Sequence, residues 1–364
     1  ARVTEGSGNA CTYSRPAGIF MDRVGSTFPG CTLFAGREMD GRALRVAQRW
    51  EDSYPDALMK SRVHQSSRAG RVHAWLELVR APNLLSVPGD PLAGAALAAV
   101  AAETAPDPRA LCAVVGASLC LYAFGLILND LRDLAEDRRD RPERPLPRGA
   151  VGMRAARVAA VLLAAAGLVF SVAAGTAPGL VGLALLAAIV LYDTVAKGTP
   201  AAPLVMGSCR GLSFLLGGAV GGFGRVVWIA AVTEALYITA VTVLARGETR
   251  AQRYGGRAYA PALILVTGLL VLFGMRLEER PPVVQIAVLL IAAGCAVQVG
   301  RAGRRLGRGV VEPAVTQPTI GLLIRTLMLW QSALLMLAGW WPVSLCVLAA
   351  WGVAHPLGRR FSPS

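Results

Sequence analysis

Asn129-Asp130-Leu131-Arg132-Asp133-Leu134-Ala135-Glu136-Asp137 follows directly on a nearly continuous apolar run, Ala110 to Leu128. In a helix, Asp130, Asp133 and Asp137 share one face, because positions i, i+3 and i+7 lie above one another. Three carboxylates on one face repel each other unless a cation lies between them. Carboxylate oxygens suit Mg²⁺, which commonly completes its shell with water and substrate phosphates. The stretch therefore predicts a diphosphate site at the end of a membrane helix.

Arginines crowd the proline-rich segment that follows these acids: Arg138, Arg139, Arg141, Arg144 and Arg148. Guanidinium groups are natural partners of phosphate oxygens, and the prolines prevent the helix from continuing. We expect Arg141 and Arg144 to bind diphosphate. The alternative is a charged juxtamembrane loop that obeys the positive-inside rule. That alternative explains the arginines, but it leaves the regular spacing of acids against a bilayer unexplained.

Apolar stretches of membrane-spanning length recur through the 364 residues, which have a mean hydropathy of +0.50 and 16% charged residues. The expected spans are Leu84–Ala102, Ala110–Leu128, Ala155–Gly175, Gly179–Tyr192, Pro203–Gly222, Val226–Ala245, Tyr259–Met275, Val283–Val299, Ile320–Leu337 and Trp341–His355. A span needs about twenty residues if it is upright, and several of these are shorter. The pattern predicts an all-α, polytopic transmembrane helical bundle.

The net charge of +14 is distributed by loop. Arginines cluster in Arg132–Arg154, Arg246–Arg257 and Arg301–Arg308, whereas the intervening loops carry few. This alternation predicts a multi-pass protein of the cell membrane whose active-site loops face the cytoplasm, next to anionic lipids. Basic residues interleaved with aromatic residues are missing from the sequence, so we expect no nucleic-acid partner.

The domain organisation is expected to be simple. Residues 1–70 are polar and lack an apolar run, so they read as a disordered extension, or one produced by a start assigned too early. Residues 71–358 are the expected transmembrane domain, and residues 359–364 a short C-terminal tail. The sequence says nothing of the oligomeric state.

A second group of polar residues ends the fourth span, in Tyr192-Asp193-Thr194-Val195-Ala196-Lys197. Lysine is rare in this chain, and the Lys197 ammonium is a suitable point charge for a phosphate. The alternative is a lysine that extends from a helix end toward water. Arg210 lies well inside the next span, where a charge is costly and indicates a functional site, although a salt bridge to a buried acid that serves packing is also open.

A third group follows the sixth span. Arg246 and Glu248 lie at its cytosolic mouth, and either could act on a diphosphate or a metal ion. Glu234 belongs to the same apolar helix, but we expect it near the outer end, away from the site.

The order and spacing of these motifs resemble those of the UbiA superfamily of intramembrane prenyltransferases. Asn129–Asp137 and Arg141–Leu146 resemble its first Asp-rich motif, Arg80–Asn83 its opening, and Tyr192–Lys197 its Tyr-x-x-x-x-Lys loop. The stretches Met206–Arg210 and Val241–Glu248 most resemble the EboC-like branch.

The resemblance implies about nine transmembrane helices around a cavity, with Mg²⁺ bridging two Asp-rich motifs to a polyprenyl diphosphate. This chain departs from the pattern, because the second motif usually has two aspartates and here has only Glu248. That leaves open whether Glu248 still binds a metal ion or Arg246 replaces it.

The expected reaction is Mg²⁺-dependent transfer of a prenyl group from a prenyl diphosphate to a lipophilic acceptor, for which an aromatic compound is a candidate. The expected metal ligands are Asp130, Asp133, Asp137 and Glu248, and the expected diphosphate ligands are Asn129, Arg141, Arg144, Lys197 and Arg210. Tyr192 would stabilise an allylic cation through its ring face or hydrogen-bond the diphosphate, and Asp193 would act as a base or as a partner of Lys197.

Two alternatives remain. One is a cyclase of the same fold that needs no acceptor. The other is a transporter or scaffold, which is disfavoured because such a protein should show internal repeats and acids near the bilayer midplane.

Overall fold

The computed structural model describes residues 68–361, and the expected extension and the end of the C-terminal tail fall largely outside this range. Residues 72–361 form the unit considered below. Its regular elements are helices, apart from one isolated antiparallel bridge between Gln252 and Val311. The prediction of an all-α bundle is therefore confirmed for the described residues.

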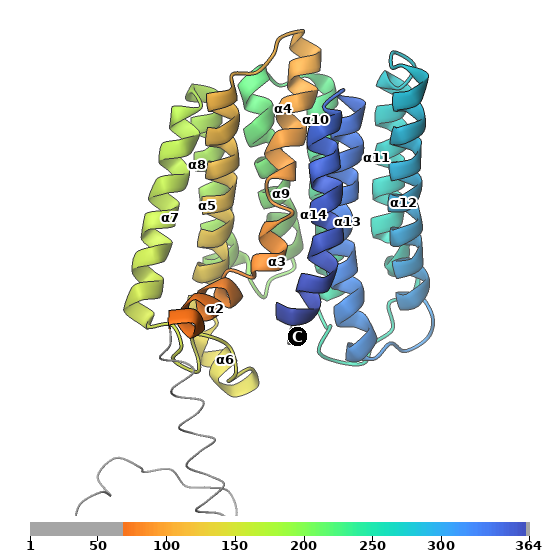
Figure 1. Cartoon of the computed structure of the whole chain (residues 1–364). Coiled ribbons are helices and arrows are strands. Elements are labelled where there is room, and N and C mark those ends of the chain that lie inside the picture. Colours follow the sequence, from red (N-terminus) through yellow and green to blue (C-terminus); the bar gives the residue numbers. More distant parts are fainter. Residues whose placement is uncertain (1–67, 362–364) are drawn as a thin grey trace, which may run out of the picture. The chain divides into compact units, whose positions relative to one another are not determined.

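The helices follow one another up and down through the bundle (Figure 1). Their bounds are α2 Arg68–Leu78, α3 Ala81–Leu84, α4 Gly89–Ala102, α5 Pro108–Arg132, α6 Leu134–Asp140, α7 Met153–Ala173, α8 Thr176–Leu191, η1 Tyr192–Ala196, α9 Ala202–Gly221, α10 Arg225–Ala245, η2 Gly255–Tyr259, α11 Ala260–Arg276, α12 Pro282–Leu306, α13 Pro313–Leu337 and α14 Trp341–Phe361. We call the end of the bundle that carries α6 the motif end.

Nine helical segments between residues 81 and 337 are long and apolar enough to cross a membrane, judged by length and composition. Large apolar side chains such as Val161, Leu180 and Leu290 are exposed on the outer faces of α7, α8 and α12, as lipid contact requires. The tenth apolar stretch is also helical. It forms α14, which runs beside α13 (Figure 1).

The first span is interrupted. α3 ends at Leu84 and α4 begins only at Gly89, after a turn that contains Pro88. Irregular backbone at membrane depth must find partners within the protein. Here the Ser86 carbonyl accepts hydrogen bonds from Gln331 Nε2 at 3.0 Å and from Arg210 Nη2 at 3.5 Å.

α4 and α9 pack closely because glycines line their contact. A Cβ atom on Gly217 would lie 1.8 Å from the Pro91 carbonyl oxygen, and one on Gly94 would lie 2.1 Å from the Phe214 carbonyl oxygen. Small residues let the backbones of membrane helices approach in this way. This contact is part of the core of the bundle, in which Tyr237 and Trp330 are fully buried.

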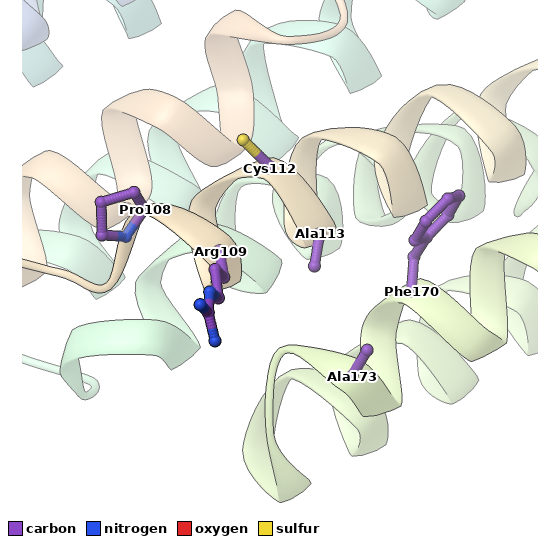
Figure 2. A pocket seen from close by; sticks show the side chains of 6 residues that line it. All are labelled: Pro108, Arg109, Cys112, Ala113, Phe170 and Ala173. Carbon is purple, nitrogen blue, oxygen red and sulfur yellow. The ribbon is translucent and has the colours of Figure 1, made fainter.

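One hollow on the bundle lies far from α6. It has a volume of about 490 Å³ and lies between the start of α5 and the end of α7. Figure 2 shows its lining, which is apolar apart from Arg109: Pro108, Arg109, Cys112, Ala113, Phe170 and Ala173. Arg109 and Asp130 are near opposite ends of α5, roughly 30 Å apart at 1.5 Å per residue. This hollow is therefore separate from the Asp-rich motif.

Candidate active site

The Asp-rich motif spans a bend between two helices. Asp133 flanks the end of α5 and the start of α6, and its backbone lies at φ −83°, ψ −1°. Helical hydrogen bonds continue on both sides, from Asp133 N to Asn129 O at 2.9 Å and from Asp137 N to Asp133 O at 2.8 Å. The expectation of three acids on one continuous helix was therefore wrong, because the chain turns at the middle acid.

Each aspartate of the motif forms an ion pair with at least one basic side chain. Asp130 lies 3.5 Å from Arg80 Nη2, and Asp137 accepts hydrogen bonds of 2.8 and 3.0 Å from Arg144 Nη1. The same Arg144 atom is 3.7 Å from Asp130. Asp130 and Asp137 are buried, so these ion pairs are more strongly coupled than surface pairs would be. The two outer acids thus share one guanidinium.

Arg80 adopts a backbone conformation that is rare for its residue type. Its φ of 48° and ψ of 57° place it in the left-handed region, between α2 and α3. A non-glycine residue there is strained and depends on its surroundings to stay. The sequence signalled Arg80 only through the resemblance of Arg80–Asn83, and its contact with Asp130 was not predicted.

The end of the fourth span packs against the motif. Tyr192–Ala196 forms one turn of π-helix, a widened helical turn that often occurs at functional sites. Asn129 Nδ2 donates to Asp193 Oδ1 at 2.9 Å, and Lys197 forms an ion pair with Asp133. Asp193 is buried and Tyr192 is half-buried. The first and second predicted groups therefore meet through two side-chain contacts.

The third group lies beside the first. Arg246 donates a hydrogen bond to the Thr199 carbonyl, which ties the end of α10 to the loop before α9. Glu248 is half-buried, and this burial raises its pKa above 4.5. The charges of Arg141, Arg80 and Arg144 act in the opposite direction. Glu248 thus lies within electrostatic range of the arginines that accompany the first motif.

Arg210 has other partners. It lies 3.0 Å from Asp90 Oδ1 and 3.6 Å from Glu234 Oε1, deep among α4, α9 and α10. These contacts favour the salt-bridge alternative, and a role for Arg210 in diphosphate binding stays a prediction. Glu234 lies near the middle of α10, so its expected place near the outer end was wrong.

Asp90 and Gln331, which join this interior cluster, were missed by the sequence reasoning. An acid in the first apolar span and an amide in the ninth are signals that could have found them. Asp90 and Glu234 are acids inside the bundle, where a transporter is expected to carry them. The objection to a transporter is therefore weaker than the sequence indicated.

The donors at the motif end suit a hard cation. Carboxylate oxygens of Asp130, Asp133, Asp137 and Glu248 are the ligand type that Mg²⁺ prefers. Within residues 68–361, no three His, Cys, Asp or Glu side chains converge closely enough to hold a metal ion by themselves. Mg²⁺ usually binds through one or two carboxylates plus phosphates and water, so this donor set fits it without forming a complete cage.

The fold and this site define a multi-pass helical membrane protein with a cluster of ion pairs at one end of its bundle. Residues 91–308 match the UbiA prenyltransferase family, and the chain belongs to that family.

Named relatives cover part of the chain. A digeranylgeranylglyceryl phosphate synthase of Ignicoccus hospitalis is 38% identical over 124 residues, which are 34% of this chain and 38% of that protein. The enzyme of the same name from Natronomonas pharaonis is 32% identical over 178 residues, 48% of this chain and 61% of that protein. The chain thus spans between 38% and 61% of the length of these relatives. The resemblance to the EboC-like branch stays a prediction.

Two solved structures share the fold. One is that of a digeranylgeranylglyceryl phosphate synthase in membranes, with a TM-score of 0.53 at 19% identity. The match covers 74% of this chain and 98% of that protein. The other is a UbiA homologue from Archaeoglobus fulgidus bound to GPP and Mg²⁺, with a TM-score of 0.50 at 14% identity, covering 72% and 99%. At this identity the likeness concerns the fold alone.

Proposed function

We propose that this protein transfers a prenyl group from a prenyl diphosphate to a lipophilic acceptor. The observation that carries the proposal is the junction of the Asp-rich motif with the Tyr192–Lys197 turn, through Asn129–Asp193 and Lys197–Asp133. Membership in the UbiA prenyltransferase family supports it. In the reaction the allylic C–O bond breaks, diphosphate leaves, and the carbon bonds to the acceptor, which releases a proton.

The cations at the motif end supply the diphosphate site. Lys197, Arg141 and Arg144 stabilise the charge that develops on the leaving oxygens. In the structure Lys197 and Arg144 are held by aspartates. For these two cations to bind phosphate, the aspartates must therefore pair with another cation.

Asp130, Asp133, Asp137 and Glu248 would hold Mg²⁺. When bound, Mg²⁺ neutralises the diphosphate and makes it a better leaving group. The A. fulgidus structure with GPP and Mg²⁺ supports this requirement. Asn129 orients Asp193 through its hydrogen bond, and Asp193 accepts the proton that the acceptor loses. The ring of Tyr192 would stabilise the allylic cation, or its hydroxyl would hydrogen-bond the diphosphate.

Two classes of acceptor are candidates for this reaction. The relatives are named for digeranylgeranylglyceryl phosphate, which supports a glyceryl phosphate lipid as the first acceptor to test. An aromatic lipophilic acceptor is the second candidate. We further propose that the motif end faces the cytoplasm, because the arginine clusters lie there.

The test measures diphosphate release by the purified full chain. Labelled prenyl diphosphates of several lengths are incubated with Mg²⁺, alone, with a prenylated glyceryl phosphate, or with an aromatic acceptor. Release that needs an acceptor supports transfer, whereas equal release without any acceptor indicates cyclisation. No release under any of these conditions contradicts an enzymatic role.

Asp133→Ala and Asp130→Ala should each lower the release rate by at least a hundredfold while the protein still inserts into membranes. Each substitution removes a proposed metal ligand and the counterion of a phosphate-binding cation. Glu136→Ala is a matched control, because Glu136 lies in the same motif but is exposed. Full turnover by either aspartate variant, or in excess chelator, would exclude the metal assignment.

A further inference from the structure

A separate cluster of polar side chains lies inside the bundle, away from the ion pairs of the Asp-rich motif. Asp90 on α4, Arg210 on α9, Glu234 on α10 and Gln331 on α13 meet there. Asp90, Glu234 and Gln331 are fully buried, and Arg210 is 9% exposed. All four belong to segments that can span the membrane. The group therefore brings ionisable side chains into the interior of the bundle.

The hydrogen-bond donors in this group are unevenly distributed over the four carboxyl oxygens of Asp90 and Glu234. Asp90 Oδ1 accepts hydrogen bonds from Arg210 Nη2 at 3.0 Å and from Gln331 Nε2. Asp90 Oδ2 and both carboxyl oxygens of Glu234 have no hydrogen-bond donor. The nearest approach of Arg210 to Glu234 is 3.6 Å, which is too long for a hydrogen bond. Three buried oxygens of two carboxyl groups thus lack the donors that burial demands.

The charges do not balance either. One guanidinium faces two carboxylates, so the group carries one excess negative charge if both acids are ionised. An uncompensated charge at this depth is very unfavourable. Asp90 and Glu234 lie against the same guanidinium, that of Arg210, and two ionised carboxylates can only accept hydrogen bonds. One proton between them would cancel the excess charge and supply one of the missing hydrogen-bond donors.

We infer that Asp90 and Glu234 share one bound proton at neutral pH, which makes this group a proton-binding site inside the bundle. The proton belongs to Glu234 and is donated to Asp90 Oδ2, because Asp90 Oδ1 already receives two donors. The indole N–H of Trp330 on α13 is also buried and has no hydrogen-bond partner, so it does not supply the missing donor. Tyr122 on α5 adds a hydroxyl within electrostatic range of Arg210 and Asp90. The group is then neutral overall.

The site links helices that carry residues of the motif end. α4 follows the Arg80 turn, α9 follows Lys197, and α10 leads to Glu248. Loss of the proton would leave two adjacent carboxylates that repel each other across α4 and α10. Glu234 is therefore a positioning residue, and its protonation holds the helices that present the diphosphate site.

The test compares the wild type with Glu234→Gln in detergent, as thermal stability against pH and as the infrared band of protonated carboxylic acids. A proton bound only in the folded state makes wild-type stability fall as pH rises above the ordinary glutamate range, up to tenfold in the folding constant per pH unit. Glu234→Gln keeps the size and supplies an N–H donor. It should lose that pH slope and the acid band together.

Glu103→Gln is the matched control, because Glu103 is exposed beyond the end of α4. It should keep both the slope and the band. Asp90→Asn is a second variant: Glu234 must then ionise as the only counterion of Arg210, so the band should disappear there too. If wild type and Glu234→Gln show the same slope and the same band, the inference is wrong. Wild-type stability that depends on NaCl and not on pH would indicate a bound monovalent cation and would also overturn it.

Discussion

Glu248 and Arg246 distinguish two ways in which this site can hold a diphosphate. If Glu248 binds a second Mg²⁺, Glu248→Gln should raise the Mg²⁺ concentration needed for half-maximal activity about tenfold, because Mg²⁺ prefers charged oxygen ligands. Since burial raises the pKa of Glu248, the wild-type Mg²⁺ requirement should increase as pH falls, starting at a higher pH than for an ordinary glutamate. Glu248→Gln should lose this dependence.

Arg246→Lys separates the other possibility. Arg246 contacts the Thr199 carbonyl, and a lysine cannot form a paired hydrogen bond to phosphate. If Arg246 replaces the second metal, Arg246→Lys should lower the rate and Glu248→Gln should leave the Mg²⁺ titration unchanged. Titrating Mg²⁺ against activity in both variants at two pH values therefore decides between them.

Some residues of the motif end were selected from the sequence for a chemical reason, and their roles stay predictions. Asp133 and Lys197 were both selected as candidates, and the structure brings them together. Asp90 was missed because one acid among apolar residues has no periodicity that points to a partner 120 residues away. Sequence order alone does not reveal which helices are neighbours, so the interior ion pairs could not be derived from it.

At the scale of elements, the contact between α4 and α9 depends on a missing side chain. Gly217→Ala should destabilise the protein by about 1–3 kcal/mol, because the new Cβ would overlap backbone atoms of Pro91 that cannot move freely. The midpoint of thermal unfolding in detergent measures this.

Gly294→Ala is the matched control for that substitution. Gly294 also lies inside a long helix, α12, but a Cβ there would meet no atom within 4 Å. Its unfolding midpoint should stay the same or rise, since alanine favours a helix more than glycine does. An equal loss of stability in both variants would show that helix propensity, and not the α4–α9 contact, causes the effect.

The spans themselves were predictable because length and apolar composition determine them. Their interruptions were harder to predict. The turn before α4 contains Pro88, which could have signalled it, but the bend at Asp133 and the π-helical turn at Tyr192–Ala196 have no comparable marker. Both lie at side-chain contacts between helices, namely the ion pair Lys197–Asp133 and the hydrogen bond Asn129–Asp193. Tertiary contacts therefore set the local geometry that the site uses.

For the whole molecule, the arginine pattern in the sequence agrees with the arrangement of the helices. Three arginine clusters begin at or near the ends of α5, α10 and α12, which all run toward the motif end: Arg132–Arg154, Arg246–Arg257 and Arg301–Arg308. Arg109 and Arg225 begin helices at the opposite end. This asymmetry is what the positive-inside rule requires of a protein with a cytoplasmic motif end.

The path of α14 provides the test of this orientation. α14 returns beside α13, so it ends at the same end of the bundle as α6 (Figure 1). A reporter fused after residue 361 should therefore lie in the cytoplasm, where a fluorescent protein matures and alkaline phosphatase stays inactive. The same reporters inserted in the loop 103–107, between α4 and α5, should give the opposite result. If both sites report reversed signals, the orientation is wrong. If both sites report the outside, α14 does not cross the membrane, and the bundle ends with the ninth span.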